Sequence, residues 1–409
     1  MSTQLNAIQS AHTRHYFIDW LRVIAFATLI FYHIGMLYSQ NWGFHFKSNY
    51  TSEHVEYFML LFSPWRMLLI WFISGVALRF MLDKVSGYKL CALFVLKRSI
   101  FILLPLLVGL WLVVPFQLYA EMHQQGVIDI TYWQFYLAFL DTSNSIFVNY
   151  QSGVWPHVDV NHLWYLRSLW QFMLIVFIYS LVAKLSIFSS LLNTIKVNLS
   201  FSMFTGLLVI AMLLANNCLK GDAIREVSGF IFLFTGYLLA KNTYFWKSLN
   251  RYLWLLCTSF TLLYVCIALA YQNELDLPNY VWTAIYNTQR VVGVLTMLTL
   301  AQRFLNFKAA YLNTLNSWVF PFYVLHQSVL IILCFVLQPF NLGLIVELFL
   351  IIVGTWGACA AITFVVMRID IIRPLLGLKI KNSYSPTIKK AGYILGMLLI
   401  LPLAYQLVF

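Results

Sequence analysis

The chain has 409 residues, of which 61% are hydrophobic and only 10% are charged. Soluble domains contain about 25% charged residues, so a water-soluble globule of this size is excluded because it could not cover its surface. The same composition excludes a disordered chain, a collagen, a disulfide scaffold and a nucleic-acid-binding domain. The apolar runs are long and do not alternate in polarity, which favours membrane-spanning helices over barrel strands.

Apolar runs long enough to cross a bilayer follow one another along the whole chain. They predict an all-α, polytopic transmembrane helical bundle with a ten-helix core and an eleventh span. The chain then divides into a cytoplasmic tail over 1–16, a transmembrane domain over 17–370, and a basic cytoplasmic segment with the final span over 371–409. The eleven runs cover 17–38, 57–82, 99–120, 163–183, 199–217, 226–240, 252–271, 280–302, 317–338, 343–367 and 391–409.

The Lys and Arg residues alternate between the two sides of these runs. Eighteen of the 26 lie in the N-terminal tail, in the even-numbered connections or after the tenth run, and only three lie in the odd-numbered connections. Connections rich in Lys and Arg stay in the cytoplasm. The alternation therefore predicts a cytoplasmic N-terminus and explains the net charge of +12 without an acidic partner.

Five arginines remain inside the apolar runs, where a charge is costly and indicates a functional site. The alternative is that a side chain near the end of a span reaches the lipid headgroups, and it applies most readily to Arg79 and Arg167. Arg66 and Arg290 lie well inside their runs, and the fifth arginine is Arg22 of the first span.

Arg22 and His33 of the first span are the strongest candidates for chemistry. They are eleven residues apart, which is about three helical turns, so they share one face roughly 16 Å apart along the axis. Asp19 precedes Arg22 by three residues and can pair with it. A neutral imidazole at this depth can take a proton from a hydroxyl, as general-base catalysis requires. The carboxylates that could orient the ring are Glu53, Glu56, Asp159 and Glu347.

The second span carries Arg66 in its outer half and Arg79 near its inner end, with Ser74 and Gly75 between them. Arg79 lies close to the basic second connection, which contains Arg98. A small-residue pair permits another helix to approach closely, and this is equally the pattern of ordinary helix packing.

The longest connection, 121–161, contains no Lys or Arg and many aromatic residues, among them Trp155. It is either an aromatic belt at the headgroups or a platform for a hydroxyl-rich acceptor. His157, Asp159 and His162 have a spacing that a metal could use, but we predict no metal site.

Four motifs occur in the order typical of the acyltransferase-3 family of bacterial inner-membrane acyltransferases, which the chain resembles from about 14 to 370. It looks most like the branch that includes the periplasmic-glucan succinyltransferase. The motifs are Asp19 with Arg22-x10-His33, Arg66-Met67 leading to Ser74-Gly75, Asn161-His162-Leu163-Trp164-Tyr165-Leu166, and Phe322-Tyr323-Val324-Leu325-His326.

The resemblance implies an integral O-acyltransferase of the bacterial inner membrane. It would move an acyl group, acetyl or succinyl, from cytoplasmic acyl-CoA to a hydroxyl of an extracytoplasmic glycan. Acyl-CoA is then a donor substrate and not a tightly bound cofactor. The expected partners are acyl-CoA, the glycan acceptor and the lipid bilayer, with no nucleic acid.

The motifs and the depths of the residues together assign roles. We expect His33 to be the general base and Arg66 or a nearby amide to stabilise the oxyanion. The expected catalytic residues are His33, His326 and Arg66. The residues expected to bind acyl-CoA are Arg22, Arg79, Arg98, Ser74 and Gly75. The residues expected to bind the acceptor are His162, Trp164, Asp159 and Trp155.

Alternatives remain open at this level. The protein could carry the acyl group through a covalent intermediate rather than transfer it directly. A secondary transporter of a small polar or anionic solute would also use intramembrane charges and a ninth helix kinked at Pro321. A scaffold or receptor without chemistry is the third alternative.

Overall fold

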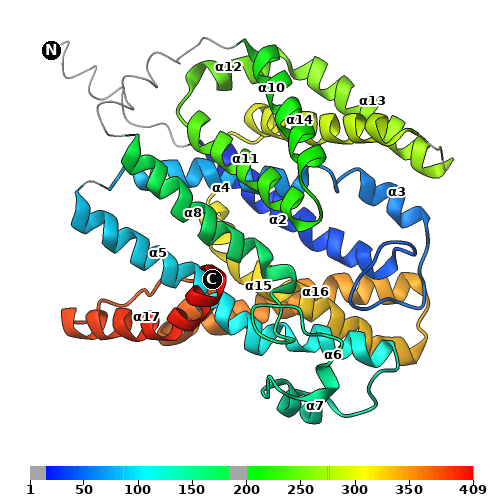
Figure 1. Ribbon diagram of the computed structural model, residues 1–409, viewed down its shortest axis with the longest axis vertical. Coiled ribbons are helices and arrows are strands. Elements are labelled where there is room, and N and C mark those ends of the chain that lie inside the picture. Colours follow the sequence, from blue (N-terminus) through cyan, green and yellow to red (C-terminus); the bar gives the residue numbers. More distant parts are fainter. Residues whose placement is uncertain (1–14, 86, 184–199, 274, 276, 409) are drawn as a thin grey trace.

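The protein folds as a bundle of helices (Figure 1). The computed structural model describes residues 15–85, 87–183, 200–273, 275 and 277–408. Within these ranges the only extended pairings are two isolated bridges, Ser39 with Ser52 and Trp155 with Val158. The predicted all-α class is confirmed. Most of the predicted tail (1–14) and of the connection between the fourth and fifth spans (184–199) lies outside the described residues.

The helices vary in length, and the longest described connections between α-helices cover 140–163 and 369–385. The α-helices are α2 (Tyr16–Tyr38), α3 (His54–Leu60), α4 (Arg66–Leu82), α5 (Tyr88–Val108), α6 (Pro115–Gln124), α7 (Tyr132–Phe139), α8 (Trp164–Val182), α10 (Phe201–Cys218), α11 (Asp222–Leu239), α12 (Thr243–Arg251), α13 (Leu253–Gln272), α14 (Asn279–Phe304), α15 (Leu312–Leu337), α16 (Leu344–Arg368) and α17 (Pro386–Val408). The short or irregular turns are η1 (Gly109–Val113), η2 (Ser145–Phe147), η3 (Asn161–Leu163), η4 (Gln338–Phe340) and η5 (Asp370–Leu376).

Each predicted apolar run contains a helix. Among the described residues, eight helices are long and apolar enough to cross a membrane, and the bent pair α11 and α12 makes a ninth if it forms one span. The other two runs hold α4, which has only 17 residues, and α14, whose 26 residues include several polar ones. The second run differs from its predicted extent, because turns at 61–65 separate α3 from α4 and Arg66 begins the spanning helix.

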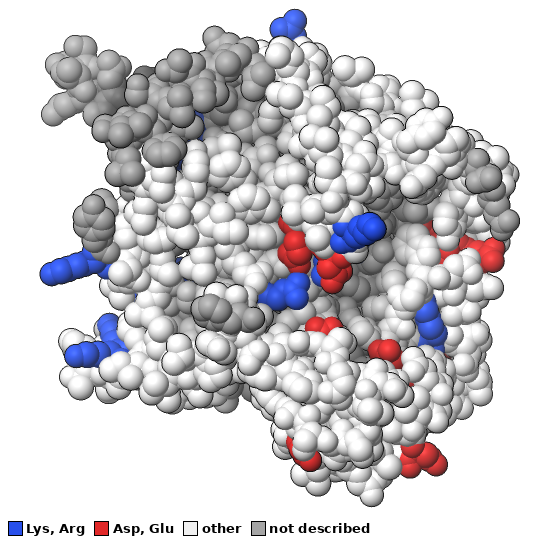
Figure 2. All heavy atoms as spheres, in the orientation of Figure 1, with Lys and Arg blue, Asp and Glu red and all other residues white. Residues whose placement is uncertain are grey.

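Helices α2, α4, α8 and α15 run through the middle of the bundle (Figure 1). Helices α10, α12 and α13 lie on one side of this group, and α5, α16 and α17 lie on the other. On the face drawn in Figure 2, most of the surface carries no charged side chain, and acidic and basic side chains gather around a hollow near its middle. A surface with so few charged side chains suits contact with lipid.

A π-helical turn, η1, joins α5 to α6 and sets the direction of α6. Pro115 has no N–H with which to bond the carbonyl of Trp111, and the Tyr136 hydroxyl donates to that carbonyl instead at 2.9 Å. The hydroxyl of Ser328 on α15 donates to the Val113 carbonyl at 2.6 Å. Because η1 is anchored in this way, the first turn of α6 faces α15.

Helices α4 and α11 approach each other so closely that their backbones touch. A Cβ atom added to Gly75 would overlap the Leu233 carbonyl oxygen, and one added to Gly236 would overlap the Phe72 carbonyl oxygen. Small residues at both contact points are what close helix packing in a membrane requires. Gly75 therefore has a packing role in this structure.

Replacing Gly75 by alanine should destabilise the protein, because the new methyl group has no space unless α4 and α11 move apart. We expect a loss of about 1–3 kcal/mol, measured as a lower Tm of the purified protein in detergent. Gly206 on α10 has no atom within 4 Å of its added Cβ, so Gly206→Ala is the matched control. An unchanged Tm for Gly75→Ala would contradict the close packing.

Candidate active site

Two histidines from different helices meet inside the bundle. The Nδ1 atom of His33 on α2 lies 2.9 Å from the Nε2 atom of His326 on α15. His326 is fully buried, whereas His33 is half-buried and stacks on the ring of Phe44. This contact joins the first and ninth predicted spans at one point.

The hydrogen-bond partners determine which ring nitrogens carry hydrogens. The Nδ1 atom of His326 lies 2.8 Å from the carbonyl oxygen of Tyr323, which can only accept, so this nitrogen is the donor. In neutral His326 the Nε2 atom is then an acceptor, and His33 must donate its Nδ1–H to it. As a result, the Nε2 atom of His33 keeps a lone pair that can accept a proton from a substrate.

A third histidine, His162, packs against His326 with its ring perpendicular and the ring centroids 5.4 Å apart. Its Nε2–H donates to the Val324 carbonyl at 3.0 Å, and its Nδ1 accepts a hydrogen bond from Gln117 of α6 at 3.0 Å. The amide oxygen of Gln117 accepts a hydrogen bond from Gln327. His162 is therefore a fully satisfied residue that supports the wall behind the histidine pair.

The predicted common face of Arg22 and His33 is observed. Both side chains point to α15, where Arg22 donates to the Asn316 amide oxygen at 3.3 Å and His33 meets His326. Arg22 also lies 3.7 Å from Asp19, as the spacing of these residues predicts. Helices α2 and α15 are thus joined by polar contacts at two levels about three turns apart.

A cavity of about 660 Å³ opens beside the Arg22 level. This volume lies in the range of sites for small molecules and cofactors. Helices α2, α4, α5, α8 and α15 form its walls, and residues 377–381 form its rim. Five cations line it, and the described lining contains no Asp or Glu; the five are Arg22, Arg98, Arg373, Lys379 and Lys381.

Arg373 has an unusual position in this lining. Its side chain is 3% exposed, and its Nε atom has no hydrogen-bond partner within the described part of the chain. Its Nη1 atom lies 3.4 Å from a carboxylate oxygen of Asp370. A buried guanidinium with an unused donor in the lining of a cavity favours an anionic ligand.

Asp370 holds the rim of the cavity in place. The backbone N–H groups of Lys381 and Asn382 donate to its carboxylate, and the first of these contributes most to keeping the pKa of Asp370 below its ordinary value. A lowered folded-state pKa stabilises the fold above the unfolded-state pKa, and that contribution disappears as the pH falls through the folded-state value. The rim is therefore held at neutral pH and released only in acid.

Along α15 the cavity ends at Tyr323, one helical turn before His326, and along α2 it ends at Phe26, about two turns before His33. Phe26, Tyr165 and Tyr323 line it, and their rings pack edge to face with centroids 5.6–6.3 Å apart. The Tyr165 hydroxyl is 2.6 Å from the Ser74 hydroxyl, which also lines the cavity. His326 follows Tyr323 by three residues, so the aromatic cluster separates the basic cavity from the two imidazoles.

Arg66 contacts Tyr32, the residue before His33 on α2, and the rings of Tyr32 and His33 lie edge to face with their centroids 5.9 Å apart. Arg66 is 9% exposed, and its guanidinium carbon is 3.1 Å from the centroid of the Tyr32 ring. The Nε and Nη1 atoms have no hydrogen-bond partner among the described residues. Two unused donors beside a potential base are suited to a developing negative charge.

A family model described as an acyltransferase domain matches residues 15–364. The chain belongs to the acyltransferase-3 family. Comparison with curated proteins and with solved structures found no match to this chain. The protein is therefore a multi-pass membrane acyltransferase, in agreement with the eight or nine apolar helices of its described part.

The structure of this acyltransferase divides the residues that were expected to bind the donor. Arg22, Arg98 and Ser74 line the basic cavity, whereas Arg79 and Gly75 do not. Arg79 is 3.1 Å from a carboxylate oxygen of Asp83 and lies over the ring of Tyr237. Arg79 was expected to bind acyl-CoA because it is near the inner end of its span, and in the structure its side chain lies toward Tyr237 of α11.

The residues expected to bind the acceptor are also separated. Trp155 packs on the ring of Trp111, and an oxygen of Asp159 accepts from the Val160 N–H at 2.6 Å. Trp164 is covered on one face by the guanidinium of Arg225, 4.2 Å from its ring. None of these three residues contacts the histidine pair.

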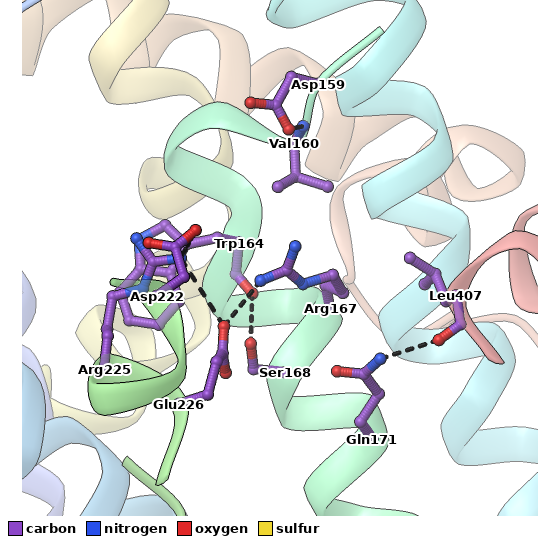
Figure 3. A network of polar contacts seen from close by, with 10 residues as sticks. All are labelled: Asp159, Val160, Trp164, Arg167, Ser168, Gln171, Asp222, Arg225, Glu226 and Leu407. Carbon is purple, nitrogen blue, oxygen red and sulfur yellow. Dashed lines mark hydrogen bonds and ion pairs between the residues drawn. The ribbon is translucent and has the colours of Figure 1, made fainter. Parts of the chain in front are cut away.

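Trp164 instead borders a network of charges between α8 and α11 (Figure 3). Arg167 donates to Glu226 at 2.7 Å, and Arg225 lies 3.3 Å from Asp222 and 3.7 Å from Glu226. Arg167, one of the five intramembrane arginines, is thus paired with a carboxylate and does not need a lipid headgroup or a substrate.

Among the described residues no carboxylate is hydrogen-bonded to His33, and each of the four that the sequence offers has another position or partner. Glu56 and Glu347 are buried and accept hydrogen bonds from other side chains, Glu53 is exposed, and Asp159 bonds a backbone N–H. Two of the three residues whose spacing could suit a metal also have other partners. His157 bonds the Phe139 carbonyl, and His162 bonds Gln117 and the Val324 carbonyl. Within the described residues no three potential metal ligands form a group.

Sequence reasoning missed Asn316, Gln117, Arg373 and the two lysines at the rim of the cavity. Asn316 had only an approximate signal, because it precedes His326 by ten residues, one fewer than the eleven that separate Arg22 from His33 on α2. Gln117 and Arg373 had none, because both act through contacts with helices that are distant in the sequence.

Proposed function

We propose that this acyltransferase moves an acyl group from cytoplasmic acyl-CoA to a hydroxyl of an extracytoplasmic glycan at the bacterial inner membrane. The single observation that carries the proposal is the His33–His326 pair, of which His33 is partly exposed, one turn of α15 beyond a cavity lined by five cations. A thioester donor with several phosphate charges suits such a cavity. The alternation of Lys and Arg along the sequence supports a cytoplasmic N-terminus, and thus a cytoplasmic donor cavity.

In the proposed reaction His33 is the general base. Its Nε2 atom takes the proton of the sugar hydroxyl while the hydroxyl oxygen bonds to the thioester carbon. Arg66 donates to the oxygen of the tetrahedral intermediate. The carbon–sulfur bond then breaks, and the CoA sulfur leaves with the proton from His33. His326 acts through His33, whose ring it orients, and is a positioning residue.

The covalent alternative predicts that the protein itself becomes acylated. Incubation with acyl-CoA in the absence of acceptor, followed by mass spectrometry of the intact protein, distinguishes the two routes. Direct transfer predicts an unchanged protein mass. The family assignment favours either route over a secondary transporter, and likeness to the periplasmic-glucan succinyltransferase branch suggests a glucan as the acceptor.

The experiment that tests the proposal is mass spectrometry of surface and periplasmic glycans from a deletion strain and from the wild type. We expect the deletion strain to lack one acyl group per modified sugar, and the mass difference names the acyl group. Complementation with the wild-type gene should restore it, whereas a His33→Ala gene should not. Identical glycans in both strains would contradict the proposal.

The donor cavity gives a second prediction. Lys379→Gln changes an exposed rim residue, and Arg373→Gln removes a buried donor, so both should weaken phosphate binding. Because hydrogen bonds to charged groups contribute about 1.5–3 kcal/mol, we expect the KM for acyl-CoA to rise about tenfold or more with little change in kcat. Arg368 is exposed and does not line the cavity, so Arg368→Gln is the control, and a KM that rises equally there would refute the assignment.

A further inference from the structure

Helix α17 lies at the edge of the bundle beside α5 (Figure 1) and beyond residue 364, where the match to the family model ends. Near its middle a Cβ atom added to Gly396 would lie 3.2 Å from the Ile100 side chain of α5, so the two helices are closely packed there. Near its end the Leu407 carbonyl accepts a hydrogen bond from Gln171 of α8 at 2.9 Å (Figure 3). These contacts fix α17 against the bundle.

Two apolar hollows separate α17 from its neighbours along one side. Their volumes are about 510 and 400 Å³. Leu96 of α5 and Met397 and Leu401 of α17 line both hollows, which therefore form one groove, called here the α5–α17 groove. The groove is open to the bilayer, because Leu401 and the neighbouring Leu398 are exposed. An apolar groove that opens into the hydrocarbon region is suited to a lipid chain.

Lysines gather at one end of the α5–α17 groove. Lys389 and Lys390 line it at the start of α17, and both are exposed. The Nζ atom of Lys97 on α5 lies 5.2 Å from the ring centroid of Tyr393, which also lines the groove. The described lining contains no Asp or Glu, and among the described residues no carboxylate lies within ion-pair distance of these three lysines. Basic side chains between helices at a membrane surface favour an anionic headgroup.

The length of the groove matches one leaflet of a bilayer. Its apolar part on α17 begins at Tyr393 and ends at Ala404, which is about 16 Å along the helix axis. Half of the hydrocarbon core of a bilayer is about 15 Å thick. The lysines therefore lie at headgroup level when the apolar part lies among the acyl chains of the same leaflet. The alternation of Lys and Arg in the sequence predicts that this is the cytoplasmic leaflet.

We propose that the α5–α17 groove binds one anionic phospholipid. The headgroup phosphate contacts Lys389 and Lys390, and an acyl chain fills the groove between α17 and α5. The groove shares no residue of its described lining with the basic cavity, so this lipid site is separate from the donor site. The inference goes beyond the proposed function and does not depend on it.

The test measures the binding of two phospholipids with the same acyl chains, phosphatidylglycerol and phosphatidylcholine. Each is titrated into the purified full-length protein in detergent, and native mass spectrometry gives the fraction of protein that carries one lipid. We expect the wild type to bind phosphatidylglycerol about tenfold or more tightly than phosphatidylcholine.

The charged end of the groove is tested with the double variant Lys389→Gln and Lys390→Gln. Near a membrane surface each lysine strengthens the binding of anionic lipid about fivefold. The double variant should therefore lose the preference for phosphatidylglycerol and bind phosphatidylcholine within about twofold of the wild type. Lys247 and Lys308 are exposed and do not line the groove, so the double variant Lys247→Gln and Lys308→Gln is the matched control that should keep the preference.

The apolar part is tested with Leu401→Trp. Leu401 is 58% exposed, so the larger ring does not disturb a buried core and instead occupies the groove. This variant should weaken the binding of both phospholipids about tenfold. Leu399 is exposed on the same helix and does not line the groove, so Leu399→Trp should bind both lipids as the wild type does.

Equal affinity of the wild type for both phospholipids would overturn the proposal, and so would a Lys389→Gln and Lys390→Gln variant that keeps the preference. A wild-type dimer that carries no phospholipid and that Leu401→Trp converts to a monomer would make the groove an interface between two copies of the chain, which also refutes the lipid site. None of these measurements involves acyl transfer, so their failure is distinguishable from a failure of the proposed function.

Discussion

Replacing His33 by alanine is expected to lower acyl transfer by about 100- to 10,000-fold, which is the usual contribution of a general base. The Nε2 atom of His33 carries the free lone pair at this point of the bundle, because its Nδ1–H is donated to His326. The measurement is the initial rate of acyl transfer to a glucan by purified protein in liposomes.

Protein amount and Tm should stay close to those of the wild type, because His33 is only half-buried and alanine is the best helix former. His54 of α3 is an exposed histidine, and His54→Ala is the control that should retain full activity. A His33→Ala protein that keeps more than a tenth of the wild-type rate would rule out His33 as the base.

Replacing His326 by leucine is expected to lower kcat about 10- to 100-fold, with His326→Gln retaining more activity than His326→Leu. Leucine leaves the Nδ1–H of His33 without an acceptor, so the ring loses both its orientation and its tautomer. The amide oxygen of glutamine can reach the position of the lost Nε2 atom and accept the same hydrogen.

The pH profile of kcat distinguishes positioning from a merely structural role. His326→Gln should keep the shape of the wild-type profile at a lower rate, whereas His326→Leu should change it because the basicity of His33 depends on its hydrogen bond. If the glutamine and leucine variants have equal rates and equal profiles, His326 does not act through His33.

The face of α2 could be predicted from sequence because helical geometry is local. Eleven residues are three turns, and the structure directs both Arg22 and His33 to α15. The extents of most helices could also be predicted, because an apolar run in a bilayer must satisfy its backbone hydrogen bonds within the protein, which a helix does. The exception is the start of α4, where turns at 61–65 interrupt an apolar run. Pro64 lies in this break and was a signal in the sequence that the prediction did not use.

The partners of each site residue could not be predicted, because they depend on which helices pack together. Arg79 and Arg373 illustrate the difference. Both are arginines, which commonly bind phosphate groups. Arg79 contacts Asp83 and Tyr237, whereas Arg373 lies in the turn η5 after α16 and lines the cavity. The orienting group of His33 was sought among carboxylates, and it is an imidazole 293 residues away.

The central claim is that the histidine pair joins a donor cavity on one side of the bilayer to an acceptor on the other. Sealed liposomes with the protein in one orientation, acyl-CoA outside at the basic cavity and glucan enclosed within, test it most directly. The account predicts acylated glucan inside the vesicles and free CoA outside, both absent with His33→Ala. Acylation only when donor and acceptor share one compartment would contradict it.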